Sequence, residues 1–214
     1  MQKLVAGYRK FRTEIFPARQ EEFAKLERGQ KPRALFITCS DSRIVPDLLF
    51  QTSPGELFIC RNAGNIVPAH GDHNGGVSAT LEYAVSALEV KHVIVCGHTD
   101  CGVMRGLLHP EKVAPMRNVA SWLSYAERAR AVVDHVCGQL GEEEKVVELA
   151  RQNVLAQIDN VRTHPSVAAR LAARTLEIHG WLLELHKGSV EAWSSEMGRF
   201  IPLESTFRGL ANED

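Results

Sequence analysis

This sequence lacks an excess of positive or negative charge, a long apolar run and cysteines spaced as disulfide pairs. Lys and Arg number 25 and Asp and Glu number 26, so the formal net charge is −1. Such a chain has no large field to attract nucleic acid or an anionic membrane surface, and we expect neither as a partner. No stretch approaches the roughly 18 consecutive apolar residues of a membrane span. Because residues 1–10 also lack the apolar core of a secretory signal, we expect a cytoplasmic protein.

The cysteines are odd in number and are not spaced as a disulfide framework. They are Cys39, Cys60, Cys96, Cys101 and Cys137. This usage suits a reducing compartment, in which thiols remain available to bind metal. No Gly-x-Gly-x-x-Gly turn follows the first apolar run, which argues against a dinucleotide site.

Short apolar runs alternate with helical segments along the chain. The runs predict five strands, over residues 34–38, 57–60, 92–96, 175–185 and 190–193. Strands that alternate with helices are typical of a parallel sheet with right-handed connections. We therefore predict an α/β fold: a mainly parallel four-stranded sheet with an added antiparallel edge strand, flanked by helices. With 214 residues and 44% hydrophobic composition, we expect one domain over residues 1–214.

The helical segments differ in how much apolar surface they carry. Apolar side chains recur at helical spacing over residues 3–27, as in one or two amphipathic helices, and we expect Pro17 to separate them. Residues 1–28 would then form a helical arm with no sheet of its own, which we expect to pack on a partner subunit. Residues 77–88 are apolar around the whole circumference and predict a buried helix. Further helices are predicted over residues 117–136, 142–160 and 166–173.

Residues suited to a metal follow two of the predicted strands. Cys39 ends the first strand, and His98 and Cys101 follow the third. If these strands are neighbours, their carboxyl ends bring the three side chains to one point. Two thiols and one imidazole suit Zn²⁺, and three protein ligands leave the fourth position for water, as in a catalytic site.

Cys96 is a competing ligand. Alternation along the strand would point Cys96 and His98 to the same face, so periodicity alone leaves both ligand sets open. We favour Cys101, because Cys96 should sit inside the sheet and Cys101 at its rim.

Asp41 and Arg43 lie just beyond Cys39. An Asp-x-Arg pair in a loop is ordinarily a surface ion pair worth about 1 kcal/mol or less. Two residues from a metal thiolate, the carboxylate could instead accept a proton from metal-bound water or hydroxide. The guanidinium would keep it charged and turned away from the metal.

The motifs of this chain resemble those of the β-class carbonic anhydrases. The matching segments are Cys39-Ser40-Asp41-Ser42-Arg43, Pro54-Gly55-Glu56, Arg61-Asn62-Ala63-Gly64-Asn65, Glu82-Tyr83-Ala84 and His98-x-x-Cys101-Gly102. Within the class, the sequence is most similar to the plant-type bacterial and cyanobacterial enzymes, including those linked to cyanate metabolism. The resemblance implies reversible hydration of carbon dioxide to bicarbonate and a proton, with hydroxide on zinc as the nucleophile.

The resemblance also implies roles for individual residues. One Zn²⁺ per subunit would be held by Cys39, His98 and Cys101, and the dyad Asp41 and Arg43 would orient the nucleophile. The implied substrate-binding residues are Gln30, Phe58, Tyr83 and Gly102. In this family the pocket comes partly from the neighbouring subunit, so a homodimer would be the minimal unit, and tetramers or larger assemblies are compatible with it.

Other interpretations of the candidate metal site stay open. A non-catalytic zinc module would have its fourth position closed by Asp41 or Cys96, while a related zinc hydrolase would act on sulfur analogues of carbon dioxide. Thiol chemistry without metal is a further alternative.

Asp100 departs from the family, which more often has a neutral residue there. We expect it to cap the following helix or to disfavour the hydroxide form.

Overall fold

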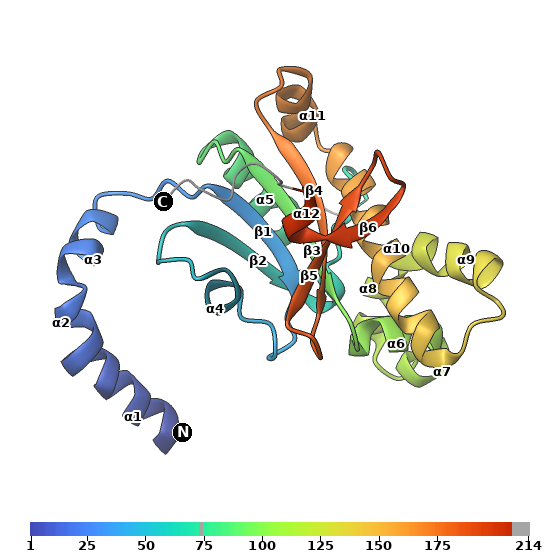
Figure 1. The fold of residues 1–214 in the computed structure, drawn as a ribbon, viewed down its shortest axis with the longest axis horizontal. Helices are drawn as coiled ribbons and strands as arrows, with labels where there is room; N and C mark the ends of the chain where they lie inside the picture. The colour runs from blue at the N-terminus through green and yellow to red at the C-terminus, as the bar shows by residue number, and fades with distance from the viewer. Residues whose placement is uncertain (73–74, 207–214) are drawn as a thin grey trace.

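Six strands form one mixed sheet in the computed structural model, which describes residues 1–72 and 75–206 (Figure 1). Their order across the sheet is β2-β1-β3-β4-β5-β6. The strands are β1 (Ala34–Cys39), β2 (Leu57–Asn62), β3 (His92–His98), β4 (Glu177–Glu184), β5 (Ser189–Ser194) and β6 (Arg199–Pro202). The first four are mutually parallel, and β5 and β6 are antiparallel additions at one edge. The predicted α/β fold is confirmed.

The sixth strand, β6, was not predicted from the sequence. It has only four residues, ends at Pro202 and follows a turn in which Gly198 has a φ of +63°. A short run that closes on proline gives little periodic signal, and proline is tolerated there because β6 lies at the edge of the sheet.

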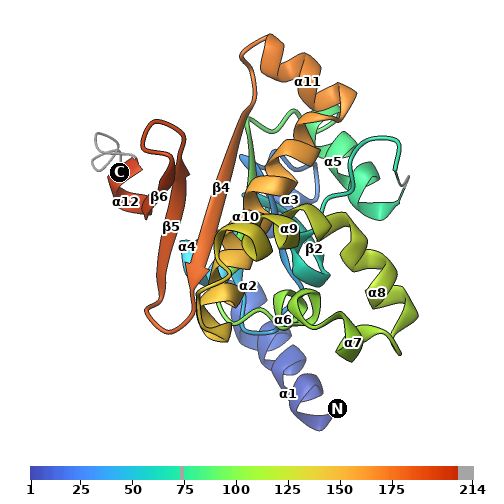
Figure 2. The same ribbon diagram turned by 90° about the vertical axis from the view of Figure 1, so that its right-hand side faces the viewer.

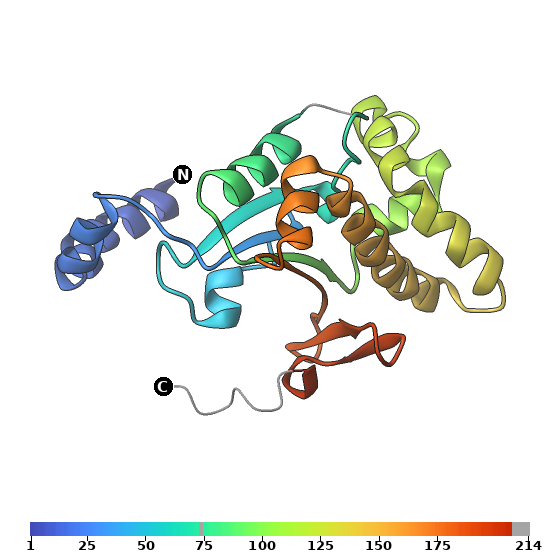
Figure 3. The same cartoon turned by 90° about the horizontal axis from the view of Figure 1, so that it is seen from above.

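Both faces of the central strands are covered, which explains their continuous apolar runs. Every residue of β1 is buried, as expected for a parallel strand between two layers. Figure 3 shows α5 (Gly76–Ser86) and α11 (Pro165–Ala172) on one side of the sheet and α4 (Pro46–Phe50) on the other. On the first side, Leu35 and Val93 pack with residues of α5, α10 and α11. On the other, Phe36 packs with Leu49 and Phe50 of α4.

The long helix α10 (Glu142–Arg162) lies unusually close to β3 and β4. Its buried side chains recur at helical spacing through Val154 and Ile158. A Cβ atom at Gly180 of β4 would lie 2.9 Å from Val154 Cγ1, and one at Gly97 of β3 would lie 2.9 Å from Val154 Cγ2. Glycine at these two positions therefore lets the helix reach the strands that lead to the metal-ligand candidates.

Smaller helices fill the segment between β3 and α10. They are α6 (Gly102–Leu108), α7 (Pro110–Val113), α8 (Arg117–Leu123) and α9 (Glu127–Val136). The single helix predicted over residues 117–136 is wrong, because a 3₁₀ turn at Ser124–Ala126 interrupts it. Ser124 Oγ donates to the carbonyl oxygen of Ser121 at 2.7 Å, a local bond that competes with the regular helical pattern.

The arm extends from the body as a chain of short helices (Figure 1), and α1 projects beyond the rest of the chain in Figure 2. It comprises α1 (Gln2–Lys10), a π-helical stretch (Phe11–Ile15), α2 (Phe16–Ala18) and α3 (Gln20–Leu26). The break predicted at Pro17 is wrong, because the bend falls at Arg19 (φ −118°, ψ 18°). The π-helical stretch precedes Pro17 and widens the turn there, which accommodates the proline ring.

The apolar side chains of the arm are exposed in the single chain. Leu4 and Tyr8 have exposed fractions of 69% and 60%, and no residue of its helices is buried by any part of the chain that the structure describes. At its base, Arg19 donates to Ser53 Oγ at 3.2 Å, and Leu26 lies against Gly55. Among the described helices, none combines the length and apolar character needed to cross a lipid bilayer.

Candidate metal centre

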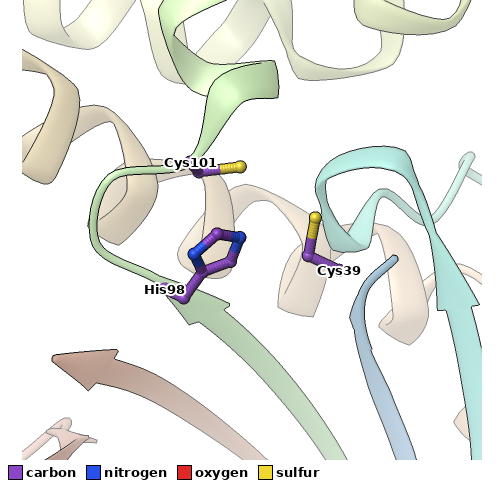
Figure 4. A group of neighbouring side chains, drawn as sticks. All are labelled: Cys39, His98 and Cys101. Carbon is purple, nitrogen blue, oxygen red and sulfur yellow. The ribbon is translucent and has the colours of Figure 1, made fainter. Parts of the chain in front are cut away.

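Two parallel strand ends and one helix start bring Cys39, His98 and Cys101 together (Figure 4). Cys39 is the last residue of β1, His98 is the last residue of β3, and Cys101 directly precedes α6. Because Thr38 pairs with Cys96 across β1 and β3, both strands end at the same edge of the sheet. The two sulfurs and a ring nitrogen lie within 4.8 Å of one another, and all three residues are buried.

The His98 ring is fixed with one lone pair facing the sulfurs. Its Nδ1 lies 2.8 Å from the carbonyl oxygen of Thr99. A carbonyl oxygen only accepts hydrogen bonds, so Nδ1 carries the proton and Nε2 carries the lone pair. Nε2 is buried and has no hydrogen-bond partner among residues 1–72 and 75–206. A buried nitrogen without a partner is costly, and a cation held between it and the sulfurs would satisfy it.

The environment of the two thiols favours one thiolate and opposes a second. Hydrogen bonding from Cys101 lowers the pKa of Cys39 to about 4, with a smaller contribution from the backbone N–H of Gly64, which lies 3.4 Å from Cys39 Sγ. The same contact, together with burial, raises the pKa of Cys101, although the N–H groups of Val103 and Met104 at the start of α6 act against that rise. A divalent cation would remove this conflict, because its charge stabilises both thiolates.

Cys96 lies outside this group. It packs in a core cluster with Phe36 and Ile94, whereas Cys39 and Cys101 pack in another with Met104. Burial raises the pKa of Cys96 to about 12, which keeps its thiol protonated. Of the two ligand sets that the sequence left open, the geometry brings together the one containing Cys101.

Arg43 makes a bidentate contact with the Asp41 carboxylate beside the metal-ligand candidates. Nε of Arg43 donates to Oδ1 at 3.0 Å and Nη2 donates to Oδ2 at 2.8 Å. These bonds hold the pKa of Asp41 well below its usual range. Oδ2 lies 4.0 Å from His98 Nε2, so the carboxylate borders the three ligand candidates.

Arg61 braces the same loop, a role that the sequence does not predict. Its Nε donates to the carbonyl oxygen of Cys39 at 3.1 Å and its Nη2 to that of Asp41 at 2.6 Å. Arg61 pairs in register with Thr38 of the neighbouring strand β1, a pairing that no sequence pattern here predicts.

Asp100 bridges two arginines and does not cap a helix. Its Oδ2 accepts from Arg43 Nη1 at 2.8 Å and its Oδ1 accepts from Arg105 Nη2 at 2.9 Å. Arg105 in turn pairs with Glu143 of α10. The expected cap is wrong: Cys101 is the residue at the cap position of α6, and no side chain caps that helix. Asp100 has a φ of +54°, which turns the chain between β3 and α6.

The substrate-binding residues implied by the resemblance do not all lie near the sulfurs of the same chain. Phe58 pairs with Leu35, four residues from the Cys39 end of the sheet, which is about 13 Å along the strand. Gln30 precedes β1 and so lies at its opposite end from Cys39. Gly102, by contrast, follows Cys101 directly and begins α6.

Tyr83 accompanies Phe58, with ring centroids 6.0 Å apart. The prediction that α5 is buried on all sides is wrong, since its buried residues are Leu81, Ala84 and Val85 and the exposed fraction of Tyr83 is 51%. The outer side of α5 is thus available to another surface.

The chain matches a family model described as "Carbonic anhydrase" over residues 34–190. It belongs to the carbonic anhydrase family.

Individual members agree with this assignment. A carbonic anhydrase from Pseudomonas aeruginosa is 44% identical over 203 residues, covering 95% of this chain and 92% of that protein. The solved β-carbonic anhydrase CcaA superposes with a TM-score of 0.93 at 40% identity, covering 94% of this chain and 91% of that one. One of two β-carbonic anhydrases from Sordaria macrospora, described as tetrameric, gives a TM-score of 0.72 at 31% identity, covering 90% and 93%. The family predicted from the motifs is therefore confirmed.

We expect metal content to distinguish the two candidate cysteine ligands from Cys96. Cys39→Ser and Cys101→Ser should lose zinc on dialysis, because a hydroxyl is a poor replacement for a thiolate. Cys96→Ser should keep stoichiometric zinc, measured by atomic emission on the folded protein. Loss of zinc from the Cys96 variant with retention in the Cys101 variant would show that the alternative ligand set is the correct one.

Proposed function

We propose that this carbonic anhydrase family member catalyses reversible hydration of carbon dioxide to bicarbonate and a proton. Cys39, His98 and Cys101 would hold one Zn²⁺ per chain. The observation that carries the proposal is the buried Nε2 lone pair of His98, which lacks a partner in the described chain and lies beside two buried sulfurs. Two sulfurs and one nitrogen suit zinc, and three protein ligands leave one position for water.

Zinc bound there would supply a Lewis acid that lowers the pKa of water toward neutrality. Asp41, held ionised by Arg43, offers an oxygen that accepts a hydrogen bond from the attacking water and so aims a lone pair at carbon dioxide. The proton released by the reaction passes to solvent or buffer.

Arg43 has a second part in this proposal. Both Asp41 oxygens are engaged by its guanidinium, so Asp41 must break two charge-assisted bonds before it can turn toward the ligand group. Asp100 restrains Arg43 from its other side. This arrangement favours a catalytic site with an accessible fourth position over a structural zinc module closed by Asp41.

We infer that the active unit is at least a homodimer in which residues 1–214 of each subunit form one domain. Gln30, Phe58 and Tyr83 would then contribute to the pocket of the neighbouring subunit, while Gly102 would serve the pocket of its own chain. Three observations support the homodimer. Phe58 is separated from Cys39, one side of α5 is exposed, and the apolar arm is exposed. The tetrameric relatives from Sordaria macrospora point in the same direction.

Removal and return of zinc tests the proposed reaction. Treatment with dipicolinate should abolish carbon dioxide hydration, measured by stopped-flow with a pH indicator, and stoichiometric zinc should restore it. Activity that survives complete removal of zinc would point to thiol chemistry. Full zinc occupancy without hydration activity would point to a structural zinc module.

Asp41→Asn separates the orienting role from metal binding. We expect unchanged zinc content and a fall in kcat of about 10²-fold or more, because the amide cannot act as an ionised acceptor. Asp134→Asn, an exposed carboxylate on α9, is the matched control and should keep full activity. Full turnover in the Asp41 variant would remove its assigned role.

Charge placed on the arm tests the dimer. Leu4→Asp combined with Tyr8→Asp should shift the protein toward monomer in sedimentation velocity and lower kcat/KM, because buried unpaired charges disfavour an apolar interface. Val136→Asp, on α9, changes a side chain with a comparable exposed fraction of 62% and should alter neither quantity. A wild-type protein that is a fully active monomer would contradict the inference.

A further inference from the structure

A second group of metal-binding side chains lies where β3 and β4 begin, at the opposite end of the strands from Cys39. His92 is the first residue of β3, and Glu177 and His179 are the first and third residues of the neighbouring strand β4 (Figure 1). His92 pairs in register with Glu177. Because side chains alternate along a strand, Glu177 and His179 share a face and converge with His92. Their ligand atoms all lie within 4.8 Å of one another.

The three ligand atoms form a nearly equilateral triangle. His92 Nδ1 lies 3.1 Å from His179 Nε2, and each nitrogen lies 3.5 Å from the same oxygen of Glu177, Oε2. The point equidistant from three atoms at these spacings is about 2 Å from each, which is the usual length of zinc–nitrogen and zinc–oxygen bonds.

We propose that His92, Glu177 and His179 form a second divalent-cation site, one that takes ions of the zinc, nickel, cobalt and copper class. Two imidazoles and one carboxylate are ligands that this class accepts, whereas Mg²⁺ and Ca²⁺ prefer oxygen alone. The site is separate from the cysteine site, because the length of β3 from His92 to His98 places about 20 Å between them.

The charges around the cluster fit a weakly held ion. The Glu177 side chain is 68% exposed, so an ion can enter from solvent. Lys31, Lys91 and Arg174 line the same cleft as His92 and Glu177. Because these cations repel a metal ion, we expect weaker binding here than at the cysteine site.

Equilibrium dialysis of the zinc-loaded holoenzyme against graded free Zn²⁺ tests the proposal. Bound zinc should rise from one to two equivalents per chain. His92→Ala and His179→Ala should remain at one equivalent over the same range, and Glu177→Gln should weaken the second equivalent by about tenfold or more. His135→Ala, which removes an exposed histidine of α9, should still reach two.

An anomalous scattering map at the zinc edge gives a readout that does not depend on the variants folding. Crystals soaked in Zn²⁺ should show a peak between His92, Glu177 and His179 in addition to any at the cysteine site. Wild-type protein that stops at one equivalent, with no such peak, would show that the two rings only hydrogen-bond to each other. A second equivalent that survives in both histidine variants would also overturn the site. Because no readout is catalytic, these results are independent of the proposed reaction.

Discussion

The parallel pairing of β1 with β3 is the constraint on which the rest of this structure depends. It places Cys39 and His98, which are far apart in the sequence, at the same edge of the sheet. A shift of one residue would turn every side chain of a strand to its other face, so burial of both faces fixes the register. Gly97 and Gly180 let α10 press on β3 and β4 just behind His98. The ligand candidates therefore stand on a rigid layer.

The central strands and the group of candidate ligands were predictable. They follow from local sequence patterns and from the rule that the carboxyl ends of neighbouring parallel strands meet at one place. Continuous apolar runs identified the central strands, and the ends of neighbouring parallel strands identified Cys39, His98 and Cys101 as one group. The choice between Cys96 and Cys101 was not decided by periodicity. It depends on how the loop after β3 turns, and that turn requires the positive φ of Asp100.

What the sequence did not predict depends on backbone carbonyls, loop conformation or neighbouring surfaces. Arg61 acts through two main-chain oxygens, which no side-chain motif reveals. The apolar circumference of α5 indicated burial, yet Tyr83 is exposed in the single chain. A pattern of apolar residues specifies that a surface will be covered and does not specify which chain covers it. Pro17 does not end the helix, because the π-helical stretch before it accommodates the proline ring.

The left-handed backbone at Asp100 narrows the amino acids that this position can hold. Glycine, asparagine and aspartate adopt such a conformation most readily, while β-branched or bulky residues are strained there. Of those three, only aspartate can also bridge Arg43 and Arg105. Glycine there would keep the bend yet remove the contact between this loop and Arg105, the residue that pairs with Glu143 of α10. Substitution at this one position would thus loosen the link between the loop and the long helix without altering the course of the chain.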